Sequence, residues 1–139
     1  MSLDLKLPDR AATEALGAAL ASGARAGRVI HLRGDLGAGK TTLAQAIARG
    51  LGVAAPATSP TYALVHRYRG RRGPVFHVDC YRLRSPDEAA DLDWEGLLRD
   101  GDALLIEWPE RAGAWLPDPT NRFRLRHVAD PERRGLEGL

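Results

Sequence analysis

Gly34–Thr42, which reads G-D-L-G-A-G-K-T-T, is the stretch that decides the expected fold. It matches the phosphate-binding P-loop (Walker A) pattern G-x-x-x-x-G-K-T, in which a glycine-rich loop leads from a strand into a helix. The apolar run Val29–Leu32 predicts that strand, and a helix is expected from Lys40 to about Gly50. Backbone N–H groups of such a loop, together with the helix N-terminus, form a site for phosphate anions.

Lys40 and Thr41 carry the two side-chain functions expected of this loop. The lysine ammonium would meet the β- and γ-phosphates of a nucleotide, and the threonine hydroxyl would bind Mg²⁺. Lys6 and Lys40 are the only lysines among 20 basic residues, so a lysine here stands out in a chain that otherwise uses arginine. The residues expected to contact the nucleotide in this stretch are Asp35, Leu36, Gly37, Ala38, Gly39, Lys40, Thr41 and Thr42.

Two acidic residues directly follow apolar runs further along the chain. Asp79 follows Val75–Val78, and Glu107 follows Ala103–Ile106. In proteins with a P-loop, an acid near the phosphates positions Mg²⁺ or the attacking water. Asp79 and Glu107 are therefore expected to be catalytic together with Lys40, and both are candidate metal ligands. The pattern leaves open which of the two binds the metal and which orients water.

Three other reactive side chains are assigned no chemistry. His31 and His77 lie in predicted strands and are expected to be core or edge residues. Cys80 is the only cysteine, so it has no disulfide partner within the chain and is expected to be a buried structural residue. A single unpaired cysteine fits a reducing, cytoplasmic location.

The remaining pattern predicts an α/β domain. Alternating leucines at residues 3–7 predict a strand, and Ala12–Leu20 an amphipathic helix. Ser85–Glu88 has the form of a capping box, so a helix is expected to start there and continue through Trp94 to Leu98. Further strands are expected at Tyr62–Tyr68, Val75–Val78, Ala103–Ile106 and Asn121–Val128, the last at a sheet edge, and the final residues either add a short strand or fray. We expect a three-layer P-loop NTPase-type fold over residues 1–139, with a mostly parallel sheet and one antiparallel hairpin.

Composition and charge limit the remaining possibilities. The formal net charge is +2, which does not by itself favour nucleic acid as a partner. The apolar runs are too short to span a membrane, and residues 2–7 lack the pattern of a signal peptide. The arginines at 67, 69, 71 and 72 form a basic hairpin that RNA or an acidic partner could contact, although a solvated loop is the better interpretation.

Taken together, the motifs resemble those of the TsaE (YjeE) family. The similar segments are, in chain order, Gly34–Thr42, Ser59–Tyr62 (S-P-T-Y), His77–Leu83 (H-V-D-C-Y-R-L) and Ile106–Glu110 (I-E-W-P-E). The resemblance covers almost the whole chain, and the second and fourth segments are far more specific to the family than the P-loop is. TsaE proteins are bacterial ATPases needed to form threonylcarbamoyladenosine (t6A) in tRNAs.

The resemblance implies a role for each motif. Thr41 and Glu107 look like the Mg²⁺ ligands, and Asp79 looks like a second acid near the γ-phosphate. Ser59–Tyr62, with Thr61, looks like a switch-type loop beside the nucleotide, and Trp108 matches a residue tied to activity. The implied cofactors are ATP and Mg²⁺, and hydrolysis is weak in isolation. The implied partners are TsaD and TsaB, and tRNA is engaged indirectly through their complex, which ATP hydrolysis resets between turnovers.

This chain departs from the family pattern at two places. Cys80 stands where the family more often has leucine, which should matter little. The C-terminal segment after Asn121–Val128 is short, so the adenine contacts that the resemblance implies from that end are left unassigned, with Arg133 or Arg134 as the candidates for one of them.

Three other functions are compatible with a P-loop. A small-molecule kinase needs an arginine-bearing lid, for which 139 residues leave little room. A GTPase needs an N-K-x-D motif, whereas the single asparagine, Asn121, is followed by arginine. A nucleotide-binding module without turnover would bind ATP and release no phosphate.

Overall fold

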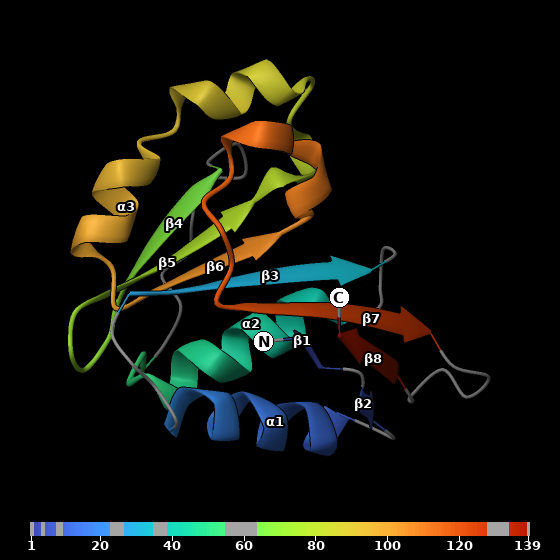
Figure 1. Ribbon diagram of the computed structural model, residues 1–139. Helices are drawn as coiled ribbons and strands as arrows, with labels where there is room; N and C mark the ends of the chain where they lie inside the picture. Colours follow the sequence, from blue (N-terminus) through green and yellow to red (C-terminus); the bar gives the residue numbers. More distant parts are fainter. Residues whose placement is uncertain are drawn as a thin grey trace.

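One mixed sheet with helical layers forms the described part of the chain, which comprises residues 2–3, 5–7, 10–22, 27–34, 39–54, 64–127 and 134–138 of the computed structural model (Figure 1). The strands are β1 (Ser2–Leu3), β2 (Leu5–Leu7), β3 (Arg28–Gly34), β4 (Val65–Arg69), β5 (Pro74–Asp79), β6 (Ala103–Glu107), β7 (Asn121–His127) and β8 (Arg134–Gly138). The helices are α1 (Arg10–Ser22), α2 (Lys40–Gly50) and α3 (Trp94–Asp100), and the 3-10 turns are η1 (Cys80–Arg82), η2 (Pro86–Asp91), η3 (Pro109–Arg111) and η4 (Gly113–Trp115).

The strand order is β2-β8-β7-β3-β6-β5-β4, and β1 pairs with β7 outside this path. The four central strands β7, β3, β6 and β5 run parallel to one another. The hairpin of β4 with β5 is antiparallel, as are the pairs of β8 with β7 and with β2. The predicted α/β fold with a mostly parallel sheet and an antiparallel hairpin is therefore confirmed.

Two details of the predicted elements were wrong, and a third was left open. The strand at Asn121–His127 lies inside the sheet, between β3 and β8, and not at an edge. The predicted helix from Ser85 is two elements, η2 and α3, because Leu92 adopts an extended conformation and Asp93 caps α3 by accepting a hydrogen bond from the Gly96 amide at 3.0 Å. For the final residues, of the two expected outcomes the structure has the short strand, β8, which pairs with β7 and β2.

Each face of the sheet carries its own apolar core, because alternate strand residues point to opposite sides. Ile30 and Leu32 of β3 pack on the side of α1 and α2, in one buried cluster with Phe123. Val29 of the same strand belongs to a second cluster with Trp94 on the other face. This arrangement accounts for the three layers seen in Figure 1. Within the described residues, no helix has the length and hydropathy needed to cross a membrane.

The contact between α1 and α2 depends on Gly17. A Cβ added at this glycine would lie 2.4 Å from the Cβ of Ala46 and 2.9 Å from the Ile47 nitrogen. Gly17→Ala is therefore expected to lower the free energy of unfolding by about 1–3 kcal/mol, as overpacking does. Helix propensity alone would raise it by about 1 kcal/mol, so the sign of the change in a urea titration decides between the two effects. Adding Ala46→Gly should recover part of the loss.

Candidate functional site

The candidate site lies at the carboxyl ends of the parallel strands β3, β6 and β5, where open α/β sheets bind their ligands. The helix α2 begins at this edge and directs its N-terminus towards it. Gly39 precedes α2 with φ 105°, a conformation that favours glycine, and its carbonyl accepts from the Leu43 amide at 3.0 Å. The predicted P-loop helix thus starts at Lys40, as expected from the sequence.

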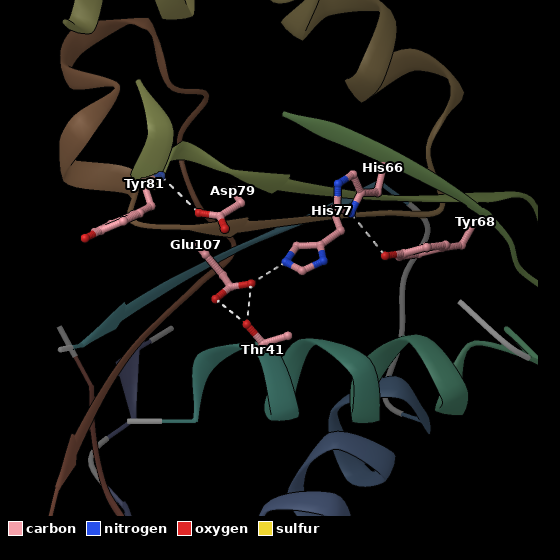
Figure 2. Close-up of polar contacts among 7 residues, drawn as sticks. All are labelled: Thr41, His66, Tyr68, His77, Asp79, Tyr81 and Glu107. Carbon is pink, nitrogen blue, oxygen red and sulfur yellow. Dashed lines mark hydrogen bonds and ion pairs between the residues drawn. The ribbon is translucent and has the colours of Figure 1, made fainter. Parts of the chain in front are cut away.

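Thr41 and Glu107 meet across this edge, as Figure 2 shows. The Thr41 hydroxyl lies 3.0 Å from Oε1 and 3.2 Å from Oε2 of the Glu107 carboxylate. Glu107 ends β6 and is only 3% exposed, whereas Thr41 is exposed in the first turn of α2. A hydroxyl and a carboxylate are oxygen donors of the kind Mg²⁺ uses, and this pair fits a Mg²⁺ site. The described residues hold no cluster of three or more His, Cys, Asp or Glu side chains suited to a metal.

His77 is a contact of Glu107 that the sequence reasoning missed. Its Nε2 lies 2.5 Å from Glu107 Oε2, and both side chains are buried. The His77 ring also packs edge-on against His66, whose Nδ1 is 3.3 Å from the Tyr68 hydroxyl (Figure 2). His77 and Asp79 are two positions apart in β5, so their side chains lie on the same face of the strand. This spacing is the signal in the sequence that could have identified His77 as a neighbour of the acids.

Asp79 and Glu107 are paired residues of the neighbouring strands β5 and β6. Both predicted acids therefore come together at the sheet edge, but their environments differ. Asp79 is half-buried, and its Oδ1 accepts a hydrogen bond from the Tyr81 amide at 2.9 Å, which caps the turn η1. Among the described residues, the Thr41 hydroxyl hydrogen-bonds with Glu107 and not with Asp79, and which acid would bind Mg²⁺ stays a prediction.

Lys40 lies against Trp108 at the start of α2. Its Nζ donates to the Gly34 carbonyl and lies 4.2 Å from the centre of a Trp108 ring, and the residue is 4% exposed. Trp108 has φ 55°, the one positive value among the described non-glycine residues, and its amide donates to the Leu32 carbonyl at 3.2 Å. A strained backbone of this kind persists where the surroundings hold it, and it places the indole over the lysine.

Arg111 contacts both the segment after Asp79 and the segment after Glu107. Its position in the sequence did not by itself establish these contacts. Its guanidinium lies 4.6 Å from the centre of the Tyr81 ring and 5.4 Å from a Trp108 ring. The same group donates to the Tyr81 carbonyl at 3.0 Å. Tyr81 and Trp108 are themselves 5.0 Å apart, so the three side chains form one stack beside the acids.

Cys80 is fully buried next to this site, as expected. Burial raises the pKa of its thiol to about 12, and the charges of Asp79 and Glu110 act in the same direction. The thiol is therefore protonated at neutral pH and suits a structural role.

Several predicted site residues lie outside the described part of the chain. They are Asp35, Leu36, Gly37, Ala38, the segment Ser59–Tyr62 with Thr61, and Arg133. Thr42 is half-buried in the first turn of α2, and Arg134 begins β8. The predicted roles of all these residues remain predictions.

A family model, curated relatives and a solved structure all relate this chain to the same family. A model of the family "Threonylcarbamoyl adenosine biosynthesis protein TsaE" matches residues 7–135. The chain is 44% identical over 109 residues to the tRNA threonylcarbamoyladenosine biosynthesis protein TsaE of Nostoc, covering 76% of this chain and 67% of that protein. It is 43% identical to the Streptomyces coelicolor protein of the same name, covering 83% and 80%. The crystal structure of Bacillus subtilis YdiB superposes with a TM-score of 0.77 at 27% identity, covering 99% of this chain and 85% of that one.

Proposed function

The chain belongs to the TsaE family, which acts in t6A biosynthesis on tRNAs, and on that premise we propose that it is a Mg²⁺-dependent ATPase of low intrinsic activity. In this proposal it works in the cytoplasm as a nucleotide-dependent switch on a complex of TsaD and TsaB. tRNA modification is its biological role, and ATP hydrolysis changes the state of the partner complex.

The contact of Thr41 with Glu107 is the observation that carries this proposal. The two side chains come from segments far apart in the sequence, yet the hydroxyl lies within 3.2 Å of both carboxylate oxygens. A threonine at the start of the P-loop helix and an acid on a neighbouring strand are the pair that holds Mg²⁺ in P-loop NTPases. His77 holds one Glu107 oxygen and so limits the rotation of the carboxylate.

Lys40 and Asp79 would complete the chemistry. Lys40 is the first residue of α2, and in this proposal its ammonium would neutralise charge on the β- and γ-phosphates. Bound Mg²⁺ would supply further neutralisation of the phosphate oxygens. Asp79 stands beside Glu107 and, being half-buried, would accept a hydrogen bond from the attacking water and orient it.

Low activity in isolation is part of the proposal. Arg111 is already engaged with the Tyr81 carbonyl and two aromatic rings, so it is not poised over the phosphates. A stabilising arginine supplied in trans can raise phosphoryl-transfer rates by about 10³–10⁵. Partner subunits are therefore the proposed source of the missing catalytic charge.

The test is an ATPase assay of the full chain with and without TsaD and TsaB, repeated with GTP. Slow ATP hydrolysis that rises on addition of both partners is expected, with little activity on GTP. ATP binding without phosphate release under every condition would favour a binding module. Transfer of the γ-phosphate to an acceptor other than water would favour a kinase.

A further inference from the structure

A cavity of about 260 Å³ lies on the face of the sheet opposite α1 and α2. His31, Arg33 and Arg122 line it from β3 and β7, and Glu110 and Leu116 line it from the segment that crosses this face. In Figure 1 that segment descends from the orange turns η3 and η4 to the start of β7. Among the described residues, the lining of this cavity includes neither Lys40 nor the pair Thr41–Glu107 of the proposed ATPase site.

Four basic side chains form a block at this cavity. His31 pairs with Arg122, and Arg33 pairs with Arg124, across the parallel strands β3 and β7. Paired residues point to the same face, and residues two apart along a strand are separated by roughly 6.7 Å. The three arginines are exposed. Their neighbours Ile30, Leu32, Phe123 and Leu125 point to the opposite side and are buried there.

Two of these arginines have their charge available for a ligand. Arg33 is loosely paired at the rim, with its Nε 3.9 Å from Glu110 Oε2. Within the described part of the chain, neither Arg122 nor Arg124 has an acidic side chain within 4.0 Å. Guanidinium groups recognise phosphate oxygens through two parallel hydrogen bonds, so a pair of them along one strand suits successive phosphates.

His31 requires a hydrogen-bond donor from the ligand, which a simple anion does not supply. The residue is 8% exposed, and its Nε2 has no hydrogen-bond partner among the described residues. Burial lowers the pKa of His31 to about 4, and the positive charges of Arg122 and Arg33 lower it further. Two groups act in the opposite direction: the Pro117 carbonyl, which accepts a hydrogen bond from the ring, and the charge of Asp118. The ring is thus neutral at pH 7. Because Nε2 is the unpartnered nitrogen, it is an acceptor that needs an O–H or N–H donor.

We infer that this face binds RNA, with Arg122 and Arg124 on successive phosphates and a ribose 2′-hydroxyl donating to His31 Nε2. The 2′-hydroxyl is the group by which proteins distinguish RNA from DNA. Trp115 lies between the lining residues Gly113 and Leu116 in the chain and is 49% exposed, so it offers a flat apolar side chain for an unpaired base.

RNA explains the observations better than an acidic protein segment does. A carboxylate would satisfy the arginines but has no proton for the neutral His31 ring, so an acidic segment would have to supply a separate N–H or O–H there, whereas the RNA backbone carries phosphates and 2′-hydroxyls in every nucleotide. The inference draws on the family's role in tRNA modification and not on ATP hydrolysis by this chain. It places the RNA contact on the central strands β3 and β7, and not on the basic hairpin at residues 67–72, for which a solvated loop is the better interpretation.

The test measures binding of a fluorescein-labelled RNA anticodon stem-loop to the full chain, by anisotropy at about 0.1 M salt without nucleotide. The same sequence as DNA is the first comparison. Arg122→Gln is expected to weaken RNA binding several-fold and to lower the slope of log affinity against log salt by about one. His31→Asn keeps a donor near the Nδ1 position but removes the Nε2 acceptor, so it should reduce the preference for RNA over DNA.

Matched controls separate this face from general charge effects. Arg99→Gln removes an exposed arginine of α3 that pairs with Asp100, and Arg69→Gln removes one from the hairpin strand β4; neither should change RNA affinity by more than about twofold. Free AMP should not displace the RNA at concentrations at which unlabelled RNA does. Thermal unfolding of each variant verifies the fold.

Three results would overturn the inference: equal affinity for RNA and DNA, an equal loss in Arg99→Gln or Arg69→Gln, or displacement by AMP, which would assign the cavity to a free nucleotide. If Arg122→Gln lost assembly with TsaD and TsaB but still bound RNA as the parent does, the face would be assigned to an acidic protein. That result would also overturn the inference. ATPase activity is measured in parallel, so failure of the proposed function is seen separately.

Discussion

Glu107→Gln is expected to lower partner-stimulated ATP turnover by about 10²–10³, the loss seen when one preorganised charge-stabilising group is removed. The substitution keeps the size of a buried side chain that contacts both Thr41 and His77. It removes the negative charge that the hydroxyl–carboxylate pair would present to Mg²⁺. ATP affinity measured without Mg²⁺ should change little, because the carboxylate does not face the phosphates directly in the proposed arrangement.

The controls for Glu107→Gln compare it with two other acids. Asp79→Asn should also lower turnover, but it should leave the Mg²⁺ dependence of ATP binding intact, because Asp79 makes no contact with Thr41. Glu95→Gln changes an exposed acid in the first turn of α3 and should behave as the parent. If the turnover of Glu107→Gln stayed within about twofold of the parent, Glu107 would have no catalytic role and would be only a polar residue at a strand end.

Lys40→Ala is expected to weaken ATP binding by roughly 10- to 100-fold, since hydrogen bonds to charged groups contribute about 1.5–3 kcal/mol. Lys40 is the first residue of α2 and lies 4.2 Å from a Trp108 ring, at the end of the helix that would face the phosphates. Calorimetric titration with ATP measures the loss. Turnover should fall at least as far, because the same charge would act in the transition state.

Lys40→Met separates charge from packing in this experiment. Methionine keeps an unbranched side chain against Trp108 but carries no charge, so it should weaken ATP binding as much as alanine does. Arg99→Ala, which removes a distant exposed charge, should have no effect. If Lys40→Met bound ATP as the parent does, the lysine would matter for packing at Trp108 and not for phosphate recognition.

The fold was predictable wherever neighbouring residues in the chain decide the structure. The strand that contains Val29–Leu32 and the helix from Lys40 both follow from local periodicity. The helix predicted from Ser85 failed because a good capping sequence does not ensure that the helix continues. The Ser85 side chain makes no capping bond, while Asp93 supplies the cap of α3.

Strand order was the main property that the sequence did not reveal. The alternating arginines of Asn121–His127 are typical of an edge strand, yet β7 pairs on one edge with β3 and on the other with β8. Its apolar face is buried over the helices, and its arginines 122 and 124 are exposed. Alternation reports which face of a strand is buried. It does not report whether other strands pair on both sides, which depends on hydrogen bonding between distant segments.

By itself, the sequence predicted a phosphate-binding loop between a strand and a helix, and it determined that two acids lie at the ends of later strands. Those features arise from residues adjacent in the chain. Only the tertiary structure decided that Glu107 meets Thr41 and His77, and that His31 shares a face with three arginines. These contacts join separate strands and a helix, and their existence depends on the order in which the strands pair.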